Sequence, residues 1–158
     1  MAATELHLVT DWTLAAPPAA VWEALTKPED WPVWWRAVET VDLIERGDDY
    51  GLGAYRRFTW RTALPYRVRF NMRVTRVEPM AVIEGRADGE VSGVGRWTLA
   101  PYDKGTHVRY DWSVKLNKPW MRVLAPLLRP VFAWNHDRVM TWGHEGLVRK
   151  LAGRPRGR

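Results

Sequence analysis

Hydrophobic and polar side chains alternate most regularly between Tyr66 and Thr75. Because successive side chains of a strand point to opposite faces of its sheet, this pattern predicts a strand with one apolar and one solvated face. The apolar positions are Tyr66, Val68, Phe70, Met72 and Val74, and the polar positions are Arg67, Arg69, Asn71, Arg73 and Thr75. The segment Thr106–Leu116 repeats the alternation, with Val108, Tyr110, Trp112 and Val114 opposite His107, Arg109, Asp111, Ser113 and Lys115.

The same reasoning predicts seven strands along the chain. They lie near Leu6–Leu14, Val38–Arg46, Ala54–Thr62, Tyr66–Glu78, Val82–Ala87, Val91–Ala100 and Thr106–Leu116. Turn formers such as Asp88-Gly89 and Asp103-Lys104-Gly105 make the later links as short as hairpins. Such links predict an antiparallel sheet. A sheet with one polar, solvent-exposed face must have its apolar face covered by other elements.

The chain also predicts two short helices and one long helix. Proline is tolerated in a first helical turn, so Pro17–Leu25 and Pro28–Trp35 are expected to be short helices after the first strand. In the segment Pro119–Leu151, Pro126 and Pro130 should break or kink the first part, which leaves a regular helix from about Pro130. At 100° per residue its apolar face holds Leu128, Phe132, Asn135, His136, Val139, Met140, Gly143, Gly146 and Leu147.

These elements predict an α+β fold in which a seven-stranded antiparallel sheet curls around a long C-terminal helix. The 158 residues are expected to form one domain over residues 1–152, followed by a basic disordered tail over residues 153–158. Glu5, His7 and Asp11 interrupt any signal peptide, and no apolar run reaches the roughly 20 residues of a membrane span. We therefore expect a cytoplasmic protein without stable membrane insertion.

Composition adds a hint of a ligand cavity. The eleven tryptophans suit either an ordinary wide core or the wall of a cavity for a flat or oily ligand. In the same way, Trp31, Trp34 and Trp35 would either gate a cavity mouth or simply pack a helix on the sheet. The residues expected to line the cavity and bind the ligand are Trp60, Tyr66, Phe70, Met72, Trp97, Tyr110, Trp112, Phe132, Asn135, His136, Val139 and Met140.

His136 is the main candidate for chemistry, because a buried imidazole tends to stay neutral and can exchange a proton with a ligand. The alternative is a core histidine hydrogen-bonded to a strand carbonyl or to Tyr110. Asn135 would either bind a ligand carbonyl or tie the helix to a loop. Glu84 is exposed if Ile83 points inward, but a bulge at Gly85 would make it a buried general base.

For the strand near Ala54–Thr62, the sequence does not decide which arginines point into the sheet's apolar face. Neither set of alternate positions in this segment is consistently apolar. One of Arg56, Arg57 and Arg61 could therefore enter the cavity and hold a carboxylate or an enolate.

Several function classes are disfavoured. Without cysteine there is no thiol nucleophile and no Cys-ligated metal, and HEGLV at His144 lacks the second histidine of a zincin motif. The net charge of +6 and the arginine face of Tyr66–Thr75 could suit an anionic membrane, but no aromatic residues alternate with the arginines as base-stacking sheets require. We expect no cofactor, no metal and no nucleic-acid partner.

Four segments carry a resemblance to a known family. They are APPAAVWEAL followed by PEDWPVWW, GRWTL at Gly95–Leu99, GTHVRYDWSV at Gly105–Val114, and WNHDRVMTWGHEGL at Trp134–Leu147. Together they resemble the START-like (SRPBCC) superfamily, within it the polyketide cyclase/dehydrase and lipid-transport group. The resemblance implies a helix-grip fold that binds hydrophobic molecules between sheet and terminal helix, and some members are cyclases or aromatases.

The leading hypothesis is therefore binding, transport or sequestration of a small hydrophobic or aromatic, lipid- or polyketide-like ligand. One alternative is a polyketide cyclase/dehydratase-type enzyme that uses His136 as general acid/base. The other is a structural or regulatory module with a filled core. No catalytic motif of the family maps onto this chain residue by residue.

Overall fold

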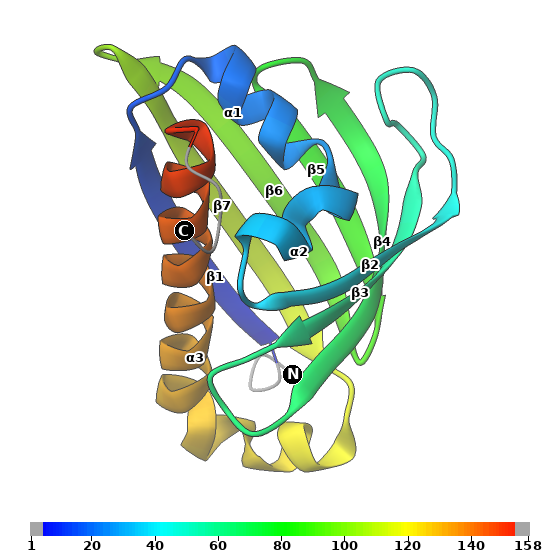
Figure 1. Ribbon diagram of the computed structural model, residues 1–158. Helices are drawn as coiled ribbons and strands as arrows, with labels where there is room; N and C mark the ends of the chain where they lie inside the picture. Colours follow the sequence, from blue (N-terminus) through cyan, green and yellow to red (C-terminus); the bar gives the residue numbers. More distant parts are fainter. Residues whose placement is uncertain (1–4, 154–158) are drawn as a thin grey trace.

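A seven-stranded antiparallel sheet curls around a long C-terminal helix in the computed structural model, which describes residues 5–153 (Figure 1). The strands follow the order β1-β7-β6-β5-β4-β3-β2 across the sheet. Their bounds are β1 (Glu5–Leu14), β2 (Val38–Glu45), β3 (Tyr55–Arg61), β4 (Arg67–Glu78), β5 (Val82–Gly89), β6 (Val91–Tyr102) and β7 (Gly105–Leu116). The predicted fold class and strand pairing are confirmed. The predicted basic tail lies, apart from Gly153, outside the described residues.

All helices lie on one side of the sheet (Figure 1). They are α1 (Pro18–Leu25), the 3-10 turn η2 (Pro28–Asp30), α2 (Trp31–Trp34) and α3 (Pro119–Leu151). The second short helix predicted from the sequence is thus divided into a 3-10 turn and one α-helical turn. Within residues 5–153, no helix is both long enough and apolar enough to cross a membrane.

Helix α3 differs from the prediction at its start. It is helical over all 33 residues, so Pro126 and Pro130 do not delay the helix to about Pro130. Of the two expected effects, a break or a kink, Figure 1 shows a bend, with the yellow first turns along the lower edge of the molecule and the orange remainder rising beside the sheet. Both prolines are exposed, so the carbonyl groups that lose their helical partners can bond to water instead.

The concave face of the sheet carries two buried clusters with a less tightly packed region between them. The upper cluster lies around α1 and α2 and includes Trp12, Trp31, Trp35, Trp97 and Leu147. The lower cluster lies at the first turns of α3 and joins Leu6, Val91, Val114, Leu116, Met121, Ala125 and Phe132. Side chains between the clusters are only partly buried, among them Trp60, Phe70, Met72, Tyr110 and Trp112.

Close contacts hold α2 against α3 in the upper cluster. The indole N–H of Trp35 donates to the Val139 carbonyl at 2.9 Å. A side chain at Gly146 would collide with the Trp34 carbonyl, and one at Gly143 would collide with the Trp35 ring. The two glycines on the apolar face of α3 therefore permit close packing against α2 and the residue that follows it.

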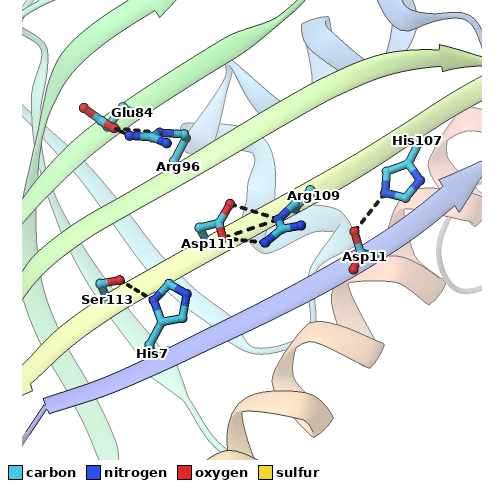
Figure 2. Close-up of polar contacts among 8 residues, drawn as sticks. All are labelled: His7, Asp11, Glu84, Arg96, His107, Arg109, Asp111 and Ser113. Carbon is cyan, nitrogen blue, oxygen red and sulfur yellow. Dashed lines mark hydrogen bonds and ion pairs between the residues drawn. The ribbon is translucent and has the colours of Figure 1, made fainter.

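The convex face of the sheet is polar. Figure 2 shows its hydrogen-bonded pairs, which run across β5, β6, β7 and β1 on the side turned away from α3. The pairs are Glu84 with Arg96, Arg109 with Asp111, Asp11 with His107, and His7 with Ser113. The solvated face predicted for β7 is thereby confirmed.

This face also decides the register of Glu84. Its carboxylate pairs with Arg96 at 2.6 Å, directly opposite on β6. The irregularity in the ladder falls in β4, between Val74 and Arg76, and not at Gly85. Glu84 therefore lies on the convex face, with 19% of its side chain exposed, as the register with an inward Ile83 predicts.

Candidate ligand cavity

A cavity of about 220 Å³ lies between the concave face of the sheet and α3, in the region that separates the two clusters. It is larger than the engineered apolar cavity of about 150 Å³ that accommodates benzene. The core is therefore not filled. The predicted lining residues Trp60, Tyr66, Phe70, Met72, Trp97, Tyr110, Trp112, Phe132, Asn135, His136, Val139 and Met140 all lie on its wall.

The sheet side of the cavity is an almost continuous aromatic surface. The rings of Trp60 and Phe70 are nearly parallel, with an angle of 8° and centroids 6.4 Å apart. Trp112 continues this surface from Phe70, and Tyr110 stacks on Trp112 with centroids 6.0 Å apart. Such a wall offers broad apolar faces to a planar guest.

Two glycines allow Met72 and Tyr110 to lie close to the sheet. Gly85 on β5 pairs with Gly95 on β6 in the centre of the concave face. A side chain at Gly95 would collide with the Tyr110 hydroxyl, and one at Gly85 would press on Met72. The hydroxyl therefore lies over the floor of the cavity, where only glycine leaves room for it.

Two buried polar atoms on the cavity wall have no hydrogen-bond partner among the described residues. They are the indole Nε1 of Trp60 and Nδ1 of His136. Buried polar groups in proteins are nearly always paired, and leaving one unpaired costs about 1–3 kcal/mol. Both residues line the cavity, so a guest whose polar group reached either atom would supply the missing partner.

Burial controls the protonation of the ionisable groups in the cavity. It lowers the pKa of His136 to about 4, so that the ring is neutral at physiological pH. Burial also raises the pKa of Tyr110, so its hydroxyl stays protonated and can donate. The hydrogen bond to Tyr110 or a strand carbonyl that a plain core histidine would make is not seen at His136 Nδ1.

Asn135 is used by the protein itself. Its Oδ1 accepts a hydrogen bond from the Ala63 backbone N–H at 2.8 Å, and its side chain also hydrogen-bonds the Tyr66 hydroxyl. Desolvation is the larger influence on Tyr66 and raises the pKa of that hydroxyl. Of the two interpretations of Asn135, the structure favours the one that ties α3 to the β3–β4 connection.

The mouth of the cavity lies beside Tyr50, a residue that lines the cavity and is 69% exposed. Arg56 lines this end with only 13% of its side chain exposed, and it forms an ion pair with Glu29 of η2. Arg57 and Arg61 are exposed on the outer side of β3. Arg56 is thus the arginine that turns toward the cavity.

Other parts of the wall were not anticipated as ligand contacts. Trp31 and Trp35 line the cavity but are buried, and Trp31 donates from its indole N–H to the Ala24 carbonyl at 3.2 Å, which indicates packing rather than a moving gate. The alternation of β1 could have pointed to Leu6 and Leu8. Glu29 and Tyr50 carry no such signal, because only the folded chain brings η2 and the β2–β3 loop to the mouth.

The other histidines of residues 5–153 lie outside the cavity and are hydrogen-bonded. His144 lies beside the Trp12 ring, and its Nε2 is 3.1 Å from the Thr13 carbonyl oxygen. His7 and Ser113 pair on the exposed face of the sheet (Figure 2). In the same described range, no three His, Asp or Glu side chains are arranged to hold a metal ion.

Comparison with solved structures identifies proteins of the same fold. The chain is similar to TTHA0849 from Thermus thermophilus, with 18% identity and a TM-score of 0.75 over 92% of this chain and 99% of that one. It is also similar to the Zhui aromatase/cyclase from Streptomyces sp. R1128, with 17% identity and a TM-score of 0.72 over 94% of each chain. The di-domain aromatase/cyclase BexL of the BE-7585A biosynthetic pathway gives 17% identity and a TM-score of 0.76, and the match covers 97% of this chain and 52% of BexL.

Sequence comparison gives the family. No curated protein matches the chain significantly. The family described as polyketide cyclase / dehydrase and lipid transport matches residues 5–152, which is nearly the whole chain. This match and the shared helix-grip fold agree with the resemblance carried by the four sequence segments, and the chain belongs to the polyketide cyclase/dehydrase and lipid transport family.

Proposed function

We propose that this protein binds a small, flat, largely hydrophobic molecule of one or two rings, aromatic or polyketide-like, in the cavity between the sheet and α3. The observation that carries the proposal is an apolar cavity of about 220 Å³ whose wall holds two unpaired buried polar atoms, Trp60 Nε1 and His136 Nδ1. Ligand sites combine such apolar walls with a few polar groups that orient the guest.

The apolar walls supply most of the affinity. A guest that buries roughly 200 Å² of apolar surface gains about 5 kcal/mol before the costs of association are subtracted. Aromatic surfaces on Trp60, Phe70 and Trp112 favour a ring system over a long acyl chain. The Zhui and BexL proteins, which share the fold, are aromatase/cyclases by name, and this supports a polyketide-like guest.

The polar atoms set the orientation. The indole N–H of Trp60 can only donate, so it requires an acceptor such as a ketone oxygen. The Tyr110 hydroxyl can donate as well, whereas the neutral His136 ring offers one donor and one acceptor. Arg56 at the mouth would attract a carboxylate or an enolate on the outer end of the guest, in exchange for Glu29.

The proposal is tested by calorimetric titration with two matched probes, naphthalene and 2-acetylnaphthalene. Both should bind, and the ketone should bind more tightly. The Trp60→Phe variant keeps an aromatic ring but removes the N–H, so it should weaken binding of the ketone by about three- to tenfold and leave naphthalene nearly unchanged. Trp142→Phe, outside the cavity, is the matched control. Absence of binding by either probe and by other one- and two-ring compounds would refute the proposal.

A second candidate function is an enzyme of the cyclase or dehydratase type. It is favoured by His136, whose neutral ring lies on the cavity wall with an unpaired Nδ1 and can take a proton in an enolisation, aldol closure or dehydration. His136→Gln should then abolish turnover of a poly-β-carbonyl substrate while affinity changes little. Full turnover by this variant would exclude His136 as the acid/base.

A further inference from the structure

The first half of α3 exposes a row of large apolar side chains to solvent. We call it the α3 stripe, and its members are Trp120 (44% exposed), Val123 (76%), Leu124 (38%), Leu127 (78%), Val131 (38%) and Trp134 (51%). Spacings of three and four residues place them on one face of the helix. The opposite face of the same turns is already buried in the lower cluster through Met121, Ala125 and Phe132. The stripe is therefore a second apolar face, and a contiguous exposed face of this kind marks an interaction site.

The surroundings of the stripe are basic. From Trp112 to His136 the sequence contains no aspartate or glutamate. Of its four cations, Lys115 and Lys118 form ion pairs with Glu5 and Glu90, whereas Arg122 and Arg129 lie on α3 itself. Arg122 is exposed between stripe residues. At the far end, Trp134 borders a surface cleft of about 620 Å³ that is also lined by Arg36, Arg61 and Arg138. An anionic partner is thus favoured by Arg122 within the stripe and by the arginines of the cleft at its far end.

We propose that the α3 stripe docks this protein onto the surface of anionic lipid bilayers. A helix with large apolar residues on its outer face and flanking cations binds in the plane of the membrane interface, where buried apolar area and attraction to anionic lipid add up. Trp120 and Trp134 stand at the two ends of the stripe, and tryptophan is the residue enriched at the level of the headgroups. The cleft beside Trp134 would receive headgroup phosphates on its arginines.

The shape of the surface favours a bilayer over a protein. The first turns of α3 run along the lower edge of the molecule as a helical ridge (Figure 1), and the stripe residues on it are exposed. A second copy is disfavoured by charge, because a symmetric pair across the stripe would bring the same basic residues, such as Arg122 and its counterpart, toward one another. A deformable anionic surface accepts both the ridge and its cations.

Docking would place the cavity next to the bilayer. Met121 and Phe132 lie on the inner side of the turns that carry the stripe, and both line the cavity. The inference does not depend on which ligand the cavity binds, since the stripe is on the outside of the helix.

The test is vesicle flotation with phosphatidylcholine alone and with phosphatidylcholine containing roughly one-third phosphatidylglycerol. We expect binding to the anionic vesicles only, and its loss when salt is raised to about 0.5 M. The double variant Val123→Asp/Leu127→Asp should bind at least about tenfold more weakly. Arg122→Gln should lose about fivefold. Tyr102→Ser is the matched control and should bind as the parent does, because Tyr102 is an exposed residue at the end of β6, whose turn into β7 lies at the other end of the molecule (Figure 1).

Thermal unfolding verifies that each variant is folded. If the Val123→Asp/Leu127→Asp variant is unfolded, the variant Val123→Ser/Leu127→Ser takes its place. Titration with 2-acetylnaphthalene should be unchanged in all of them, which separates failure of docking from failure of the cavity proposal. Equal flotation with both vesicles, no flotation, or parental binding by the double variant would each overturn the proposal. Self-association that the double variant abolishes would also overturn it and would assign the stripe to a second copy. Binding of an acidic polypeptide such as polyglutamate, without binding to vesicles, would overturn it as well.

Discussion

At the scale of single residues, the polar atoms on the cavity wall differ in whether the protein already uses them. Asn135 already hydrogen-bonds Ala63 and Tyr66, whereas Trp60 Nε1 and His136 Nδ1 have no partner within residues 5–153. An unpaired donor in an apolar cavity is an energetic cost that a bound guest can remove. These two atoms, rather than Asn135, are the points at which specificity would arise.

The His136 ring makes stability depend on pH. Its pKa is about 4 in the folded protein, and it returns to the ordinary value of 6.5 when unfolding exposes the ring. The unfolded chain therefore binds the proton first, and stability falls as the pH drops from about 6.5 to about 4, by up to about 3 kcal/mol. Urea unfolding at several pH values should reveal this fall in the parent and a smaller one in His136→Gln. His107→Gln, on the exposed face, is the control. Equal pH profiles for the parent and His136→Gln would contradict the assignment.

At the scale of secondary-structure elements, α3 has different partners along its length. Its first turns pack on the lower cluster, its centre lines the cavity, and its last turns pack against α2 through Gly143 and Gly146. The first turns contribute large apolar side chains to the lower cluster, whereas the last turns have glycines where α2 lies close. The cavity survives because contacts at both ends hold the helix away from the centre of the sheet.

The contact between α2 and α3 is sensitive to a single methyl group. In Gly146→Ala the added carbon would collide with the Trp34 backbone carbonyl, which cannot move without displacing α2. We expect a loss of about 1–3 kcal/mol in the free energy of unfolding, measured by chemical denaturation. Thr141→Ala, on the exposed side of the same helix, should change it by less than about 0.5 kcal/mol. A stabilised Gly146→Ala variant would show that the two helices are not in close contact in solution.

At the scale of the whole molecule, the open volume couples ligand binding to stability. A ligand that binds only the folded state at about one hundred times its Kd stabilises the protein by about 2.7 kcal/mol. For a chain of this size the Tm should rise by roughly 5–10 °C.

This coupling should disappear when the cavity is filled. Val139→Phe places a ring in the cavity from α3, so 2-acetylnaphthalene should raise the Tm of this variant little or not at all. Val148→Phe adds the same ring on the exposed side of the helix and should keep the full shift. A full ligand-induced shift in Val139→Phe would locate the binding site elsewhere.

Local patterns were sufficient for the architecture and for much of the cavity wall. Alternation in β4 and β7 separates inward residues such as Phe70 and Tyr110 from outward ones such as Arg69 and Arg109, because the strand period is two residues whatever the partner strand is. Helical spacing in the same way places Phe132, His136 and Met140 on the inner face of α3. The family resemblance agreed with these positions but supplied no catalytic residue.

The sequence by itself determined which faces of the strands and helices are apolar, and hence the sheet, the covering helix and the inward residues, since these follow from the geometry of each element. Only the tertiary structure decided that Arg56 turns inward beside Glu29, that the irregularity lies in β4 rather than at Gly85, and that Asn135 is engaged while Trp60 is not. It also decided that the centre of the core is left open and that α3 keeps a second apolar face in solvent. These features depend on distances between elements far apart in the chain, and no local pattern encodes such distances.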